Sequence, residues 1–154
     1  LFCYRIFFQR FQPEDTSPLL WVIMGAAAAG VNAGTVLLQT STTLSFLQAL
    51  HPFIDGVAML LWSWATWWIP MLVILAVWRH GYRRFPLKYD PLYWGAVFPL
   101  GMYAVSTEQM IEALGLSFLG FLPPSFFYIA LVAWTAAFFG LALELLARAR
   151  SLRR

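Results

Sequence analysis

Four long stretches of the chain contain no charged residue, and each is dominated by apolar side chains. They cover residues 16–54, 56–78, 91–107 and 113–143. A helix rises only about 1.5 Å per residue, so about 20 apolar residues are needed to cross the hydrocarbon core of a bilayer. The pattern predicts four membrane-spanning helices, over residues 18–38, 54–78, 91–114 and 124–147.

Cap residues mark where three of these helices are expected to begin. Ser17 precedes Pro18, and Asp90 precedes Pro91. A side-chain oxygen followed by proline is typical of a helix start, because the oxygen accepts from free backbone N–H groups and proline tolerates the first turn. Asp55 stands at the start of the second predicted helix, where the helix dipole favours negative charge, and we interpret it as a cap.

The composition supports the membrane interpretation. Hydrophobic residues make up 61% of the 154 residues, charged residues make up 11%, and the mean hydropathy is +0.70. A soluble domain carries roughly 25% charged residues, so this chain has too few to cover a soluble surface. We therefore predict an all-α, polytopic membrane protein whose four helices form two hairpins.

Basic residues are concentrated at the two ends of the chain and in one connection. They include Arg5 and Arg10, four arginines in the C-terminal "RARSLRR", and Arg79, Arg83, Arg84 and Lys88 between the second and third predicted helices. Lys and Arg are retained on the cytoplasmic side of a membrane. We therefore expect both termini and this connection to be cytoplasmic, in a plasma or inner membrane. Topology also accounts for the net charge of +3, without a nucleic-acid partner.

The leading segment, residues 1–11, is apolar and contains two arginines. We interpret it as the end of a preceding helix, with an interfacial helix as the alternative. On this interpretation the chain is part of something longer.

The four predicted helices are of two kinds. The first is rich in small residues, and Gly30 and Gly34 belong to one of its small-residue rows. Such rows let helix backbones approach closely in lipid, or they leave room along a central path. Asn32 is the one strongly polar side chain of this helix. The second and fourth helices are bulky and aromatic, so we expect helices one and three to be inner and helices two and four to be outer.

The third predicted helix contains Pro99 directly after Phe98, with Gly95 and Gly101 on either side and Met102 next along the chain. Proline has no N–H, so the carbonyl of Gly95 loses its usual partner and the helix bends. In lipid such a carbonyl must be satisfied by a neighbouring helix or a water-filled path. The bend turns Phe98 away from the regular stripe, where its ring would block a narrow path lined by Gly101 and Met102. A purely structural kink is the alternative.

Two acidic residues lie near the far end of the same helix. Glu108 and Glu112 are four residues apart and share one face. They serve either as solvated groups at headgroup level or as a proton-sensing mouth. We find no catalytic motif, no metal-ligand spacing around the histidines and no partner for the single Cys3. We therefore predict no enzyme activity, no metal and no cofactor.

Several motifs resemble one family closely. The segments "WVIMGAAAAGVNAGTVLL", "WWIP", "WRH", "RFPLKYDPLYW" and "VFPLGMY" occur in order along nearly the whole chain. Together they are similar to the tellurite-resistance/C4-dicarboxylate transporter family, which is related to plant slow anion channels and malic acid transport proteins.

The resemblance implies a ten-helix fold of five hairpins around a central pore lined by the odd-numbered helices. This chain would then supply the last four helices, six N-terminal helices would be missing, and the complete protein would form a homotrimer. A phenylalanine that plugs the pore would correspond to Phe98, and a kinking proline to Pro99.

We therefore expect transport of small anions, either C4-dicarboxylates, inorganic oxyanions or halides, through a pore gated by Phe98. No Lys or Arg lies inside a predicted helix, so selectivity would come from pore width and backbone dipoles. The alternatives are a proton-coupled dicarboxylate carrier that uses Glu108, a tellurite-resistance or sulfite efflux protein, and a membrane scaffold without transport activity.

Overall fold

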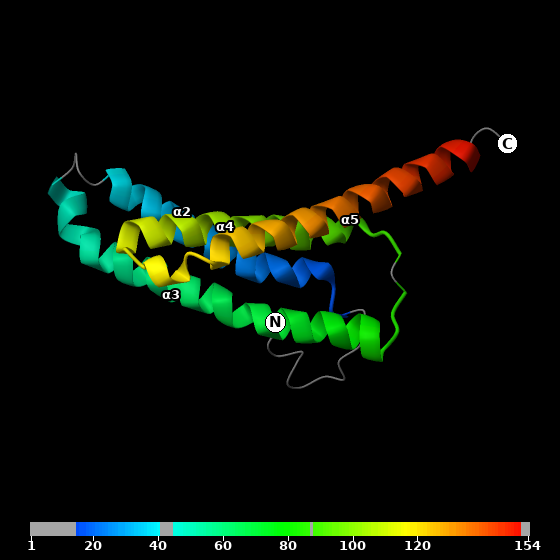
Figure 1. Cartoon of the computed structure of the whole chain (residues 1–154), viewed down its shortest axis with the longest axis horizontal. Coiled ribbons are helices and arrows are strands. Elements are labelled where there is room, and N and C mark those ends of the chain that lie inside the picture. Colours follow the sequence, from blue (N-terminus) through cyan, green and yellow to red (C-terminus); the bar gives the residue numbers. More distant parts are fainter. Residues whose placement is uncertain (1–14, 41–44, 87, 152–154) are drawn as a thin grey trace.

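Four long helices make up most of the computed structural model, which describes residues 15–40, 45–86 and 88–151. They are α2 (Trp21–Thr40), α3 (Ser45–Val77), α4 (Trp94–Leu114) and α5 (Leu122–Ser151), and no strand occurs in the described ranges. The helices run lengthwise beside one another, and the C-terminal part of α5 projects beyond the others (Figure 1). α2 packs on both α3 and α4, and α4 packs on α5. The two helices rich in small or polar residues therefore lie between the two bulky ones.

Two of the three predicted caps are used, and both open a short 3-10 turn. Ser17 Oγ accepts from the N–H of Leu19 at 3.3 Å and caps the turn Pro18–Leu20, which leads into α2. Asp90 Oδ1 accepts from the N–H of Leu92 at 2.9 Å and caps the turn Pro91–Tyr93, which leads into α4. The side chains thus satisfy N–H groups that have no partner within the turn.

The third cap prediction is wrong. α3 begins at Ser45, nine residues before the predicted start, so Asp55 lies inside the helix. Its Oδ2 is 3.4 Å from Nδ1 of His51, one turn earlier. The prediction missed the first turns of α3, and the helix continues through both Pro52 and Pro70. A proline inside a helix removes one backbone hydrogen bond and bends the helix, but it does not have to end it.

Most of the other helix ends also differ from the predicted bounds. α2 runs to Thr40, and α5 begins at Leu122 and continues to Ser151. α3 is followed by a π-helical turn over Trp78–Tyr82. α4 ends at Leu114, the predicted residue, and its C-cap Gly115 has a φ of 69°, a left-handed conformation that glycine adopts without steric cost. The predicted helix end in residues 1–11 lies outside the described residues.

Three segments within the described ranges are long and apolar enough to cross a membrane: Pro18–Gln39, Phe46–Tyr82 and Ser117–Ser151. The fold is therefore all-α and that of a membrane protein, as predicted. α4 is more polar than these three segments. Its Ser106 and Thr107 are buried, so their hydroxyl groups face the interior of the bundle. That α4 also crosses the membrane stays a prediction.

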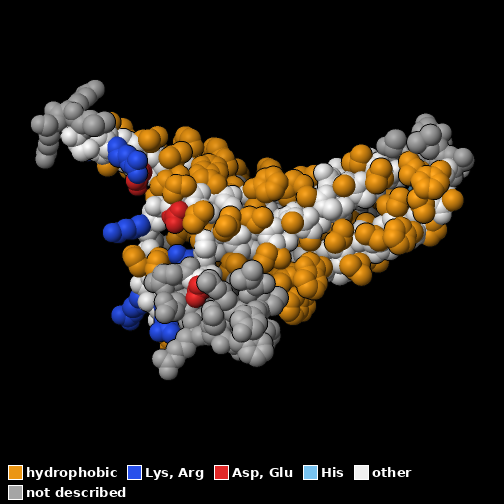
Figure 2. All heavy atoms as spheres, turned by 180° about the vertical axis from the view of Figure 1, so that it is seen from behind, with side chains coloured by type: hydrophobic (Ala, Val, Ile, Leu, Met, Phe, Trp, Pro, Cys, Tyr) orange, Lys and Arg blue, Asp and Glu red, His pale blue; other side chains and the backbone are white. Residues whose placement is uncertain are grey.

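Basic side chains gather at one end of the molecule, while most of the coloured surface on the same face is hydrophobic (Figure 2). The basic residues of the described ranges are Arg79, Arg83, Arg84, Lys88, Arg148 and Arg150. They come from the α3–α4 connection and from the end of α5, which lie at the same end of the bundle (Figure 1). This is the distribution that the positive-inside rule requires. The cytoplasmic location of this end stays a prediction.

Candidate functional site

Pro99 anchors α4 against α2. It is among the fully buried residues. A Cβ atom added to Gly25 of α2 would lie 2.8 Å from Cγ of Pro99, closer than real contacts allow. Gly95, one turn before Pro99, faces the backbone of Leu19, since a Cβ there would lie 3.5 Å from Leu19 Cα. The helix that contains the proline is therefore held closely against the beginning of α2.

Phe98 faces a different direction from its neighbour. Its side chain is 60% exposed, and it lines an open groove of about 560 Å³ between α4 and α5. Gly101 and Met102 line the same groove, and a Cβ on Gly101 would meet nothing within 4 Å. The structure thus brings together three residues that the sequence suggested for a path, with the aromatic ring largely uncovered.

Gly30 and Gly34 lie elsewhere, at the contact between α2 and α3. A Cβ on Gly30 would lie 2.8 Å from Leu61 Cδ1, and one on Gly34 would lie 3.5 Å from Ala58 Cβ. This is the close helix packing that small residues permit. These two glycines therefore do not share the groove that contains Phe98.

Asn32 lies on α2, and its backbone carbonyl accepts from the Thr35 hydroxyl at 2.9 Å. Its Oδ1 is buried and has no hydrogen-bond partner in the part of the chain that the structure describes. Thr35, one turn along α2, has its Oγ1 3.0 Å from Oε1 of Gln109 on α4. The sequence analysis did not single out Gln109. Its side-chain amide on α4 is the second amide, after that of Asn32 on α2.

A buried polar network joins α3 to α4, and the sequence analysis missed it. The hydroxyl of Tyr103 lies 2.8 Å from Oγ1 of Thr66, and Nε1 of Trp62 donates to Oγ1 of Thr107 at 3.0 Å. The ring of Tyr103 also meets the ring of Phe126 edge to face, with centroids 4.6 Å apart. The sequence did contain one signal for this network. Trp62 and Thr66 on α3 are four residues apart, as are Tyr103 and Thr107 on α4, so each pair lies on one face of its helix. The network therefore joins the middle of α4 to α3 and α5.

We expect Tyr103→Phe to lower the free energy of unfolding by about 1 kcal/mol, the net value of one hydrogen bond. Thr66 Oγ1 already donates to the carbonyl of Trp62 at 2.8 Å, so the tyrosine is the donor and only its own bond is lost. The measurement is the apparent midpoint of thermal unfolding in detergent. Tyr128→Phe, on an exposed tyrosine of α5, is the matched control. Equal midpoints for both variants would contradict the role of the network.

The acidic pair is on the surface. Glu108 and Glu112 are both exposed, and they lie in the second half of α4, away from the basic end. Among the described residues, no three His, Cys, Asp or Glu side chains are grouped closely enough to hold a metal ion. Cys3 lies outside the described residues.

Similar proteins were found at the level of family and sequence. Residues 1–142 match the profile of a family described as voltage-dependent anion channel. The chain is 31% identical over 134 residues to an uncharacterized membrane protein of Mycobacterium tuberculosis strain H37Rv, a match that covers 87% of the chain and 68% of that protein. It is 21% identical over 131 residues to two uncharacterized transporters of Methanocaldococcus jannaschii, which covers 85% of the chain and 36% of each transporter. No solved structure matches the chain significantly.

Proposed function

The chain belongs to the voltage-dependent anion channel family, and from this premise we propose that it forms part of a gated membrane path for small anions. One observation supports the gate most directly. Adjacent residues of α4 have opposite environments: Pro99 is fully buried against α2, whereas the ring of Phe98 is 60% exposed over an open groove. A fixed backbone beside an uncovered ring is what a plug in a narrow path requires.

The side chains of α2 and α4 suit weak and nonspecific recognition of an anion. Neither α2 nor α4 contains a Lys or Arg, so an anion would meet no fixed basic partner along them. The polar groups that we propose for contact are amides and hydroxyls, from Asn32, Thr35 and Gln109. Discrimination would then come from width, dipoles and the cost of removing water from the ion. Weak binding favours rapid passage, and C4-dicarboxylates, sulfite-like oxyanions, nitrate and chloride are the candidate substrates.

Further helices are needed to close such a path. The chain covers only 36% of the length of the archaeal transporters it matches. We propose that additional helices of the same protein complete the wall opposite α2 and α4, and that the complete protein forms a homotrimer. In this proposal the basic end lies on the cytoplasmic side, and the groove beside Phe98 opens toward the centre of the assembly.

A proton-coupled carrier is the second candidate, because Glu108 and Glu112 are exposed on one face of α4 away from the basic end. A carboxylate at the outer mouth could take up a proton together with a dicarboxylate. Tellurite resistance or sulfite efflux would use the same path for other oxyanions. A scaffold without transport activity would give no role to the exposed ring of Phe98.

A flux assay separates the channel from the carrier. We expect the complete protein in liposomes to dissipate a chloride or malate gradient slowly, at a rate that does not depend on a pH gradient. Glu108→Gln should change this rate by no more than about twofold. The carboxylate of Glu108 is exposed, and solvent screening leaves an exposed charge with little effect on anion flux. If flux requires an inward proton gradient and Glu108→Gln abolishes it, the carrier is the correct function. If neither anion moves, the proposed path is wrong.

A further inference from the structure

Arg79 is a buried cation that forms no ion pair with any carboxylate among the residues that the structure describes. It lies in the π-helical turn that follows α3, and its side chain is only 7% exposed. Its Nη1 donates to the carbonyl of Thr16, and its guanidinium carbon lies 4.3 Å from the centroid of the Phe85 ring. Within residues 15–40, 45–86 and 88–151, its buried Nε has no hydrogen-bond partner. Buried charges are normally paired, because removing an ion from water is costly.

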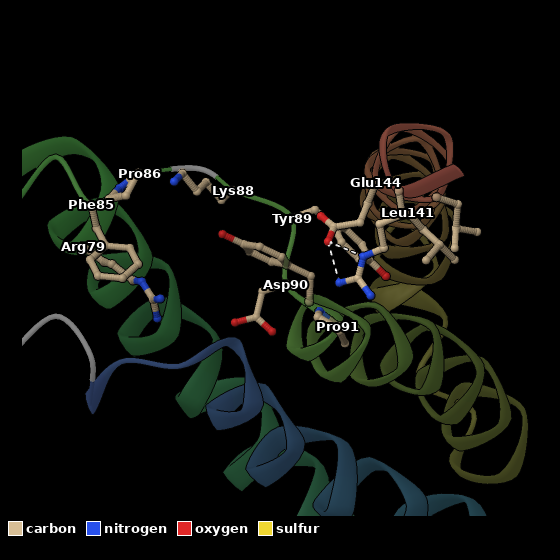
Figure 3. Close-up of a pocket in the computed structure, with 12 residues that line it drawn as sticks. Arg79, Phe85, Pro86, Lys88, Tyr89, Asp90, Pro91, Leu141 and Glu144 are labelled. Carbon is tan, nitrogen blue, oxygen red and sulfur yellow. Dashed lines mark hydrogen bonds and ion pairs between the residues drawn. The ribbon is translucent and has the colours of Figure 1, made fainter. Parts of the chain in front are cut away.

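Arg79 lines a pocket of about 480 Å³ at the basic end of the molecule. Figure 3 shows Arg79 and Phe85 on one side of this pocket, Glu144 on the other, and Tyr89 between them. Arg148 Nη2 is 2.8 Å from Oε1 of Glu144, so these two charges compensate each other. Asp90 also lines the pocket, and its Oδ1 accepts from the N–H of Leu92. The lining therefore carries three basic and two acidic side chains, and its excess of one positive charge favours an anionic group as the ligand.

The pocket continues into an apolar groove between α4 and α5. A second cavity of about 330 Å³ shares Lys88, Tyr89 and Tyr93 with the first. Beyond them it is lined only by small residues, namely Ala96, Val97, Ala133, Ala136, Ala137 and Gly140. Tyr89 stands at the junction, because its ring packs on Gly140, where a Cβ would lie 2.7 Å from Cδ2, and its hydroxyl accepts from Nε1 of Trp94 at 3.1 Å. A cationic mouth above an apolar groove has the chemistry of a phospholipid site rather than of a site for a free ion.

We propose that the Arg79 pocket binds the phosphate of an anionic phospholipid, with an acyl chain in the groove between α4 and α5. The phosphate would supply a counter-charge to Arg79 and Lys88, and charge-assisted hydrogen bonds to a phosphate are among the strong ones. All the basic residues in the described ranges lie at this end (Figure 2), where anionic headgroups would be drawn to them. The site lies between the ends of α3 and α5 and does not depend on anion transport.

Lipid binding tests the site directly. The complete protein is titrated in uncharged detergent with phosphatidylglycerol, phosphatidylcholine or inorganic phosphate, and bound ligand is counted by native mass spectrometry. We expect phosphatidylglycerol to bind at least about tenfold more tightly than phosphatidylcholine, and Arg79→Gln to lose about tenfold of that affinity. Arg83→Gln is the matched control, because this exposed arginine at the same end lies over the ring of Trp78 instead.

Two further variants keep the proposal testable if Arg79→Gln does not fold. Lys88→Gln should weaken binding of phosphatidylglycerol but not of phosphatidylcholine. Ala136→Leu, which fills the groove without changing charge, should weaken lipid binding and leave any phosphate binding unchanged. Equal affinity for the two lipids, or equal losses in Arg83→Gln and Arg79→Gln, would overturn the site. If inorganic phosphate displaces phosphatidylglycerol and Ala136→Leu has no effect, the pocket holds a free phosphate and the lipid assignment is wrong.

Discussion

Phe98→Ala should raise the anion current of the complete protein by roughly tenfold or more, because it removes a ring that we propose as the plug of a narrow path. The ring is 60% exposed. It lines the same groove as Gly101, where an added Cβ atom would meet nothing within 4 Å. Its loss therefore opens space without creating a packed cavity, and the protein should remain folded. The measurement is current under voltage clamp, with chloride, nitrate and malate in turn as the main anion.

The matched control for this variant is Phe139→Ala. Phe139 lies on α5 and is 61% exposed, so the same side chain is removed from an equally open position away from the groove. We expect its current to equal that of the wild type. If the current rises in both variants, the substitutions have disturbed the protein in general. If the current rises in neither variant, Phe98 is not a gate.

Gly25→Ala should destabilise the protein by about 1–3 kcal/mol, the usual cost of adding volume to a packed contact. The new Cβ would lie 2.8 Å from Cγ of Pro99 and 3.3 Å from its Cα. A proline ring and a backbone atom cannot rotate away, so α2 and α4 must separate. The measurement is the apparent midpoint of thermal unfolding of the complete protein in detergent.

Two variants make this second test specific. Gly56→Ala is the control, because Gly56 is also inside a long helix and a Cβ there would meet nothing within 4 Å. Pro99→Ala added to Gly25→Ala should restore part of the lost stability, because the clashing ring is then absent. If Gly25→Ala and Gly56→Ala have the same midpoint, the close contact does not hold the two helices together.

The class of fold was predictable because it depends on long apolar stretches, which are read directly from the sequence. The family resemblance found in the sequence is also confirmed. The opposite environments of Phe98 and Pro99 follow from simple helix geometry, since adjacent residues lie about 100° apart on a helix. The length of α3 was missed because the effect of Pro52 depends on tertiary packing that no local rule contains.

The Tyr103 network and the Arg79 pocket were missed for a related reason. Both join residues that are far apart in the sequence, such as Thr66 with Tyr103 and Thr16 with Arg79. The basic residues were explained as topology signals, and that explanation gave no reason to separate one arginine from the others. Only burial distinguishes Arg79 from Arg83, and burial depends on how the helices pack.

The close contact between Gly25 and Pro99 has a consequence for the timing of a gate. Because Pro99 packs closely against Gly25, α4 cannot shift at this point without separating two helices. The smallest movement available is therefore rotation of the Phe98 side chain about its two torsion angles. Rotation of an exposed side chain takes picoseconds to nanoseconds. Openings this brief are far shorter than an electrical recording resolves. We therefore expect the wild type to show a low, steady, averaged conductance instead of discrete steps, with long openings only when a larger rearrangement of α2 and α4 moves the whole ring aside.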